Sequence, residues 1–250
     1  MAIHSGIKKK LEKHTQNLAF DGVNSLTLPN ALLIIPDGNG RWAKNLGLSI
    51  SEGHKEGGRN LTKILDNFLK INIKVLGVWG FSEDNWKRYK EEIDRIMIVI
   101  EDTINENIEK IIKNNIKFIV LGKKDKIKAE YPRLFNIIIK AEEQTKDNTY
   151  KILALFLDYG EKFQLEEFAK ARITDKTSTT YDLLSKINGN LPLFDMVLRT
   201  SGEHRLSGFG PLASLAEFVS VKDNLPEMKD IDIINALKDF SSRQRRFGGR

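Results

Sequence analysis

A short polar segment, Asp37-Gly38-Asn39-Gly40-Arg41, brings together the groups that bind a diphosphate and its metal ion. The Asp37 carboxylate is an oxygen ligand of the kind that hard cations prefer, and the Arg41 guanidinium can bind two phosphate oxygens at once. The glycines let backbone N–H groups approach an anion. The segment is also typical of a turn, because Asp-Gly and Asn-Gly are common turn dipeptides. It is neither a Walker A loop nor a dinucleotide-binding fingerprint, since no Gly-Lys-Ser/Thr and no third glycine follow.

Three further segments carry comparable chemistry. Gly53–Gly57 opens an expected helix, where His54 and free backbone N–H groups could hold a second phosphate, although a helix cap is the simpler interpretation. Ser82–Arg88 places a hydroxyl, two carboxylates, an amide, an indole and two cations directly after an apolar run. Arg199–Ser207 offers arginines and hydroxyls to phosphate oxygens, with a carboxylate and a histidine near a metal, although a basic loop on RNA would have a similar composition.

The overall composition narrows the choice of partner. The 250 residues carry a formal net charge of +6 and are 40% hydrophobic and 30% charged, which is typical of a globular protein with an anionic partner. Nucleic acid, a membrane surface and a phosphorylated metabolite all fit, but glutamates between the helical lysines count against nucleic acid. With no cysteine, a metal must use oxygen or imidazole ligands, which favours Mg²⁺ over zinc. Because no signal peptide or membrane-length apolar run is found, we expect a cytoplasmic protein.

Apolar runs alternate with helical patterns, which predicts an α/β fold with a mostly parallel central sheet flanked by helices. The expected strands are 31–35, 75–81, 117–121, 150–157, 195–198 and one near Phe218. The expected helices are about 53–70, 90–113, 131–144, 165–172, 181–187 and 232–246. We predict a single domain over residues 26–250, preceded by a basic helical extension over residues 1–25. In such folds polar clusters that follow strand ends share one cleft, so the clusters after 31–35, 75–81 and 195–198 should converge.

Five segments of the chain also form a family pattern. They are IIPDGNGRW from Ile34, GHKEG from Gly53, FSEDNWKR from Phe81, LRTSGEHRLS from Leu198 and RQRRFGG from Arg243. In their order and spacing they resemble the undecaprenyl diphosphate synthase family of cis-prenyltransferases, over roughly residues 30–250. The resemblance implies an Mg²⁺-dependent homodimer that binds isoprenoid diphosphates and receives the growing chain in a hydrophobic tunnel. It allows peripheral membrane association through the product, and it implies no nucleic acid.

The resemblance also implies a role for individual residues. Asp37 would hold Mg²⁺ and assist the departure of diphosphate, and Asn85 lies at the position of the family's proton acceptor. The implied metal ligands are Asp37, His204 and Glu217. The implied substrate-binding residues are Gly38, Asn39, Gly40, Arg41, Trp42 and His54 for the first diphosphate; Ser82, Glu83, Asp84, Trp86 and Arg88 around Asn85; and Arg199, Arg205, Leu206 and Ser207 for isopentenyl diphosphate.

Four departures from the family pattern lie beside the two implied diphosphate sites. Ile50 stands where an arginine is usual, and Pro36 stands where methionine is common. Asp158 and Glu161 add negative charge to a segment that usually has the sequence Asn-Tyr-Gly-Gly. The segment 208–217 is less aromatic than usual and one residue shorter.

These departures leave three roles open. The first is head-to-tail condensation of an allylic diphosphate with isopentenyl diphosphate to a short- or medium-chain product. The second is irregular coupling of two short allylic diphosphates, such as dimethylallyl diphosphate. The third is a non-catalytic partner subunit, which typically loses the segment Asp37–Arg41 that is intact here.

Overall fold

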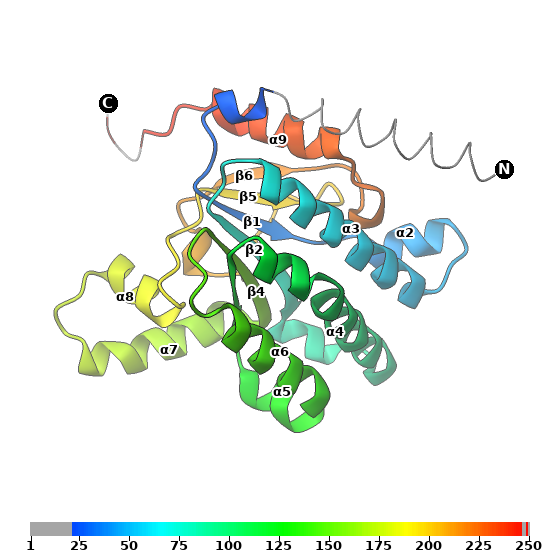
Figure 1. The fold of residues 1–250 in the computed structure, drawn as a ribbon, viewed down its shortest axis with the longest axis horizontal. Helices are drawn as coiled ribbons and strands as arrows, with labels where there is room; N and C mark the ends of the chain where they lie inside the picture. Colours follow the sequence, from blue (N-terminus) through cyan, green and yellow to red (C-terminus); the bar gives the residue numbers. More distant parts are fainter. Residues whose placement is uncertain (1–21, 247–248, 250) are drawn as a thin grey trace.

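The computed structural model describes residues 22–246 and 249, which fold around a six-stranded sheet (Figure 1). Its strands are β1 (Ala31–Ile35), β2 (Val75–Ser82), β3 (Ile116–Leu121), β4 (Lys151–Tyr159), β5 (Met196–Arg199) and β6 (Glu217–Ser220). They lie in the order β3-β4-β2-β1-β5-β6, and every neighbouring pair is parallel. All five residues of β1 are buried, as expected for a central strand that is covered on both faces. The predicted α/β fold with a parallel sheet is confirmed.

The helices in the described part of the chain follow the predicted alternation. They are α2 (Asn39–Asn45), α3 (Ile50–Lys70), α4 (Lys90–Lys113), α5 (Lys124–Glu130), α6 (Pro132–Thr145), α7 (Glu161–Thr174), α8 (Thr180–Ile187) and α9 (Asp230–Ser242). Short 3₁₀ turns are η1 (Val23–Ser25), η2 (Glu83–Lys87), η3 (Pro211–Ala213) and η4 (Leu225–Glu227). None of the helices in the described residues is long and apolar enough to cross a bilayer. The expected N-terminal helix lies, as far as residue 21, outside the described residues.

Several predicted boundaries were wrong, and two short helices were missed. Helix α3 begins at Ile50 instead of about 53, because Ser49 and Glu52 form a capping box at its start. Helix α9 ends at Ser242, four residues before the predicted end. The missed helices α2 and α5 have seven residues each, which is too short for a clear 3.6-residue pattern.

Alternate residues of the strands supply two separate apolar cores. Leu32 and Ile34 of β1 belong to the larger core, which includes buried residues of α3, α4, α6 and α9. Leu33 of the same strand belongs to the other core, where the aromatic rings of Phe156, Phe194 and Phe209 pack edge to face. The second face of the sheet is therefore covered by the long connection around η3 as well as by regular helices.

Two glycines let α2 leave the sheet directly after β1. Gly38 has a φ of +91°, and a Cβ on it would lie 2.2 Å from Asn224 Oδ1. Gly53 permits the contact of α3 with α2, since its Cβ would lie 2.2 Å from the carbonyl oxygen of Asn39. Side chains larger than hydrogen at these positions would force the turn after β1 out of place. The position of Asp37 at the edge of the sheet thus depends on both glycines.

Lys151 gives the stability of the fold a specific pH dependence. Its side chain is buried under the end of α3, where Nζ donates to the carbonyl oxygens of Phe68 and Ile71. Burial, and to a smaller extent the charge of Lys74, lowers the pKa of Lys151 from 10.5 to about 8. Between these values the unfolded chain binds more protons than the folded chain, so stability must rise with pH.

We therefore expect the free energy of unfolding, measured by urea denaturation, to rise from pH 8 towards 10.5 relative to a Lys151→Met variant. The difference should grow by at most about 1.4 kcal/mol per pH unit. Parallel curves for the two proteins would mean that Lys151 titrates in the folded state as it does in the unfolded chain.

Candidate active site

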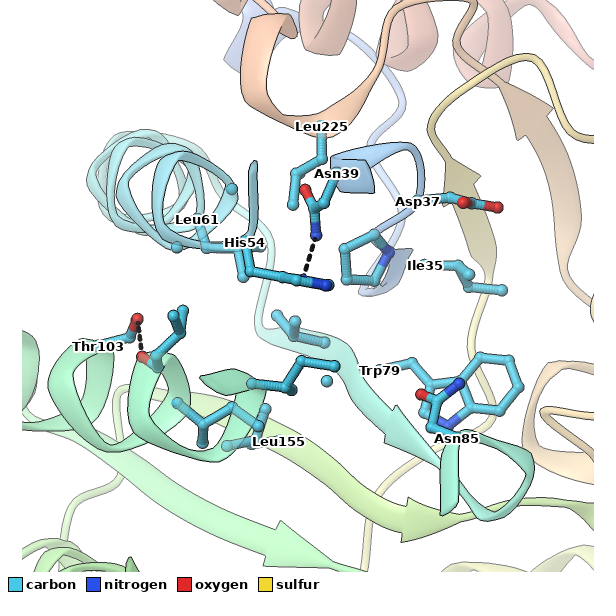
Figure 2. Close-up of a pocket in the computed structure, with 18 of the residues that line it drawn as sticks. Ile35, Asp37, Asn39, His54, Leu61, Trp79, Asn85, Thr103, Leu155 and Leu225 are labelled. Atoms are coloured by element: carbon cyan, nitrogen blue, oxygen red, sulfur yellow. Dashed lines mark hydrogen bonds between the residues drawn. The ribbon is translucent and has the colours of Figure 1, made fainter. Parts of the chain in front are cut away.

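A cavity of about 570 Å³ opens at the carboxyl edge of the sheet and continues between α3, α4 and the strands β2 and β4. This volume is within the range of about 300–1,000 Å³ that is usual for small-molecule sites. Its mouth is lined by Asp37 after β1, Asn85 after β2 and Arg199 at the end of β5. Figure 2 shows Asp37, Asn39 and His54 on one side of the hollow and Asn85 on the other. The predicted convergence of the three polar clusters is confirmed.

The charged residues at the mouth form a row of alternating sign. Arg199 Nη2 donates to Asp37 Oδ2 at 2.9 Å, and Arg41 Nη2 donates to Asp37 Oδ1 at 3.0 Å. Arg41 Nη1 in turn donates to Glu203 Oε1 at 2.7 Å, while Arg205 donates to the other oxygen of Glu203. Three guanidinium groups thus share two carboxylates, which leaves one net positive charge. The row can bind an anion, because a diphosphate can replace the carboxylates as the acceptor of the same N–H groups.

Asp37 is held in its ionised form. Burial raises its pKa, but the hydrogen bonds from Arg199, Arg41 and the Gly38 N–H outweigh burial, and the pKa lies below its usual value. Its backbone is fixed as well, since the Asp37 N–H donates to Thr200 Oγ1 at 2.7 Å and the Thr200 hydroxyl donates to the Asp37 carbonyl at 2.8 Å. The carboxylate is therefore charged and positioned before any substrate arrives.

The loop after β5 contains strained backbone. Ser201 has a φ of +74° and Ser207 a φ of +51°, a region that residues with a Cβ rarely adopt. Arg199, only 5% exposed, supports the loop from beneath, since its Nη1 donates to the carbonyl oxygen of Arg205 and to Ser207 Oγ. Strain of this kind persists where neighbouring groups hold it in place, often at a functional site.

His54 is held between Asn39 and Glu92. Asn39 Nδ2 lies 3.4 Å from His54 Nδ1 (Figure 2), and His54 Nε2 lies 3.5 Å from Glu92 Oε1. Burial, and then the charge of Arg88, lowers the pKa of His54, while Glu92 opposes the shift. The ring is therefore neutral near pH 7, with Nδ1 accepting from Asn39 and the N–H of Nε2 directed towards Glu92.

Asn85 lines the cavity and is held in place by the turn that follows β2. Its Oδ1 accepts a hydrogen bond from the Ser82 N–H at 3.0 Å, which closes the turn at the start of η2. The NH₂ group of an amide can donate to an anion, and the neutral amide is a poor base.

The predicted site residues divide into two groups. Those that line the cavity are Asp37, Gly38, Asn39, Gly40, Arg41, His54, Ser82, Asp84, Asn85, Arg88, Arg199 and Ser207. Those that do not line it are Trp42, Glu83, Trp86, His204, Arg205, Leu206 and Glu217. Several of the second group support their neighbours, as Glu83 does by its ion pair with Lys123 at 2.6 Å. Leu206 packs against the second apolar core.

The three implied metal ligands do not meet within this chain. Glu217 begins β6 and pairs with Met196, the first residue of β5, whereas Asp37 lies beyond the opposite end of the sheet. The Glu217 carboxylate is bound by Arg243 at 3.0 Å instead. Residues 22–246 contain no group of three or more His, Asp or Glu side chains that could hold a metal ion. Asp37 alone still suits Mg²⁺, which commonly uses one or two carboxylates together with substrate phosphates.

Sequence reasoning missed two residues that shape the mouth. Thr200 fixes the backbone of Asp37, although only its place in the segment Arg199–Ser207 indicated a role. Glu92 lines the cavity and contacts both His54 and Arg88, the latter at 2.6 Å. Its position one turn into a long charged helix made it look like an ordinary solvent-facing residue.

Comparisons with known proteins agree with this geometry. Residues 35–248 match the family model described as "Putative undecaprenyl diphosphate synthase". The "Isoprenyl transferase" of Fusobacterium nucleatum is 35% identical over 225 residues, covering 89% of this chain and 96% of that protein. The "Isoprenyl transferase" of Staphylococcus saprophyticus is 33% identical and covers 96% of this chain and 99% of its own length.

Two solved structures are similar to this fold. Lavandulyl diphosphate synthase from Lavandula x intermedia, in complex with dimethylallyl diphosphate, superposes with a TM-score of 0.80. A probable undecaprenyl diphosphate synthase from Campylobacter jejuni gives a TM-score of 0.72. Each is 27% identical to this chain and covers 88% of it and 98% of its own chain.

The surroundings of His54 can be tested by NMR. We expect the His54 imidazole to titrate below 6.5, because burial disfavours the charged ring. A Glu92→Gln variant should lower the pKa further, since it removes the carboxylate that favours protonation. The exposed neighbour Glu91 offers the matched control Glu91→Gln, which should leave the titration unchanged. A His54 pKa at or above 6.5 would contradict the buried arrangement.

Proposed function

This chain belongs to the undecaprenyl diphosphate synthase family of cis-prenyltransferases, and we propose that it condenses an allylic diphosphate with isopentenyl diphosphate in an Mg²⁺-dependent reaction. The product would be a short- or medium-chain polyprenyl diphosphate, with release of diphosphate. The observation that carries the proposal is the row Arg199, Asp37, Arg41, Glu203 and Arg205 at the mouth of a largely apolar cavity. A charged mouth above an apolar body fits an amphipathic substrate with a diphosphate head and a hydrocarbon tail.

Charge neutralisation is the first requirement of the reaction. The bond between the allylic carbon and the diphosphate oxygen breaks, so negative charge builds up on the departing diphosphate. Arg41 and Arg199 supply fixed guanidinium groups there, and a preorganised cation lowers the barrier because it need not reorient during the reaction. Mg²⁺ bound by Asp37 and diphosphate oxygens would neutralise further charge on the same leaving group.

The second requirement is a route for one proton. A new carbon–carbon bond joins the allylic carbon to the terminal alkene carbon of isopentenyl diphosphate, which then loses a proton to restore a double bond. Asn85 is a poor base, because a neutral amide binds a proton only weakly, and its oxygen already accepts from the Ser82 N–H. We assign the proton to an oxygen of the departing diphosphate, and we assign to the Asn85 NH₂ group the task of holding a phosphate in place.

The apolar body of the cavity meets the third requirement, which is exclusion of water from a reactive cation. Below the mouth the wall is formed by aliphatic side chains of three elements, including Leu61 of α3, Ile96 and Ile100 of α4 and Leu155 of β4. Burial of a hydrocarbon tail there contributes about 0.8 kcal/mol per methylene. We propose that this part of the cavity is the tunnel that the family resemblance implies.

A specific observation keeps irregular coupling as the second candidate. Ile50 lines the mouth and is 49% exposed, so an apolar side chain stands where a phosphate contact is expected in the family pattern. One of the two similar solved structures described above is lavandulyl diphosphate synthase in complex with dimethylallyl diphosphate. In the family pattern this contact is made to the first, allylic diphosphate, so a changed choice of allylic substrate would show at this position.

Mass spectrometry of the products separates the two reactions. The purified protein would be incubated with Mg²⁺ and dimethylallyl, geranyl or farnesyl diphosphate, each with and without isopentenyl diphosphate. We expect products lengthened by isoprene units only when isopentenyl diphosphate is present. A product from an allylic diphosphate alone would establish irregular coupling, and no product under any condition would favour the non-catalytic partner role. The predicted homodimer and the membrane association through product stay predictions alongside this proposal.

Asp37→Ala should abolish turnover, because it removes the carboxylate of the metal site, and it should also lower the free energy of unfolding, because it leaves the buried Arg199 without its carboxylate. Initial rates with saturating substrates would measure the loss, and circular dichroism would confirm folding. Asp102→Ala, which removes an exposed carboxylate on α4, is the matched control and should keep the wild-type rate. A near-normal rate for Asp37→Ala would contradict the mechanism.

Arg205→Ala should chiefly raise KM for the diphosphate co-substrate. Its side chain is 59% exposed and bound to Glu203, so it is available to a ligand at the surface of the mouth. Loss of one charged hydrogen bond that is open to solvent corresponds to about a tenfold weaker affinity. An unchanged KM would show that Arg205 does not contact the co-substrate.

A further inference from the structure

The wall of the cavity is interrupted by a polar band, defined here as Thr62, Thr103 and Asn107. All three residues line the cavity, and Asn107 is only 3% exposed. Asn107 Nδ2 donates to Thr62 Oγ1 at 2.9 Å and to the carbonyl oxygen of Thr103 at 2.8 Å. The band therefore joins α3 to α4 across the wall, while the lining above and below it is aliphatic or aromatic.

The band is a satisfied network that reaches the surface. Thr103 Oγ1 donates to the carbonyl oxygen of Val99 at 2.7 Å (Figure 2), and Asn107 Oδ1 accepts from Lys110 Nζ at 3.3 Å. Lys110 Nζ also donates to Asp66 at 2.5 Å, on the outer side of α3. Because its groups are bonded to one another, the band can remain polar inside an apolar cavity without a large cost.

The two helices also contact each other at this level. A Cβ on Gly58 would lie 2.9 Å from Val99 Cγ1 and 3.0 Å from Thr103 Oγ1, so α3 and α4 are in contact beside the band. The cavity does not end there. Ile111 of α4, Phe118 of β3 and Leu153 of β4 line its deeper part and are apolar.

The depth of the band follows from helix geometry. Helix α4 runs away from the mouth, where Glu92 lies beside His54. At 1.5 Å per residue, Thr103 is about 16 Å and Asn107 about 22 Å farther along the helix axis than Glu92. A hydrocarbon tail whose diphosphate is held at the mouth must pass this level before it reaches Ile111.

We propose that the polar band is a length-determining element, at which a bound isoprenoid tail stops gaining affinity and elongation ends. The inference rests on the proposed function, which supplies the tail. A methylene that packs against apolar walls tightens binding about fourfold, but one beside the band covers hydroxyl and amide groups instead of apolar wall, so less apolar surface leaves the water and the gain is smaller. The band thus divides the cavity into two parts. In the upper part each added carbon increases the binding affinity of the tail, and the deeper part is reached only past the band.

Binding of unreactive ligands tests this without turnover. The dissociation constants of n-alkyl diphosphates of increasing length would be measured by calorimetry, with inorganic diphosphate as the probe of the head site. For the wild type we expect Kd to fall about fourfold per methylene and then to level off at one chain length. In the near-isosteric variant Thr62→Val/Asn107→Leu the fall should continue to longer chains.

The control must separate the band from a general loss of a buried hydrogen bond. Asn67→Leu is matched, because Asn67 is a 4% exposed asparagine of α3 whose Nδ2 donates to Asp230 at 2.7 Å, away from the cavity. The Kd of the Asn67→Leu variant should level off at the same chain length as that of the wild type. Thr62→Ser keeps the hydroxyl and should also behave as the wild type.

Two results would overturn the proposal. The first is a wild-type Kd that falls steadily through all chain lengths. The second is a Kd of the double variant that levels off at the same chain length as the wild-type Kd. Failure of inorganic diphosphate to bind would instead overturn the proposed function, and the inference with it. Product analysis gives an independent check, since the double variant should yield products longer by one or more isoprene units. A destabilised protein would lose rate but would not lengthen its product.

Discussion

The ion pair between Arg199 and Asp37 ties the carboxyl ends of β1 and β5 together, and the site is built around it. A guanidinium with only 5% exposure needs a carboxylate, because an unpaired buried charge costs several kcal/mol. The residues that follow β1 and β5 must therefore have conformations that bring Asp37 and Arg199 together. Gly38 must turn with positive φ after Asp37, and Thr200 must clamp the Asp37 backbone after Arg199. The backbone strain at Ser201 and Ser207 is held by the same guanidinium and its neighbours.

The cavity lies between two long helices and the sheet. Helices α3 and α4 both begin near the mouth and run along one face of the sheet, and they are in contact beside Gly58. The charged groups lie at the helix starts and strand ends, where backbone N–H groups and loops are available, while the interior of the layer is apolar. The two environments of this parallel fold suit a ligand with a charged head and an apolar tail.

Much of this arrangement could be predicted from the sequence, for physical reasons. The strands were found because buried parallel strands are nearly continuous apolar runs, and the convergence of the polar clusters followed from the rule for parallel sheets. The three implied metal ligands do not meet within this chain, because the residue count to Glu217 does not reveal that β6 begins at the far end of its partner strand. The bond from the Ser82 N–H to Asn85 belongs to a capping box at the start of η2, a three-residue spacing that the sequence contains and that was not used. Thr62 and Asn107 looked like ordinary helix positions, because the sequence does not show which helix faces meet.

The alternating row of charges at the mouth also affects how a bound anion leaves the site. An incoming diphosphate meets guanidinium groups that are already neutralised by Asp37 and Glu203, so binding is an exchange of one anion for another and not a capture by bare cations. The reverse exchange is equally available, since the two carboxylates remain tethered beside the arginines. Built-in counterions of this kind weaken the binding of any anion, so a mouth with three guanidinium groups can still release one.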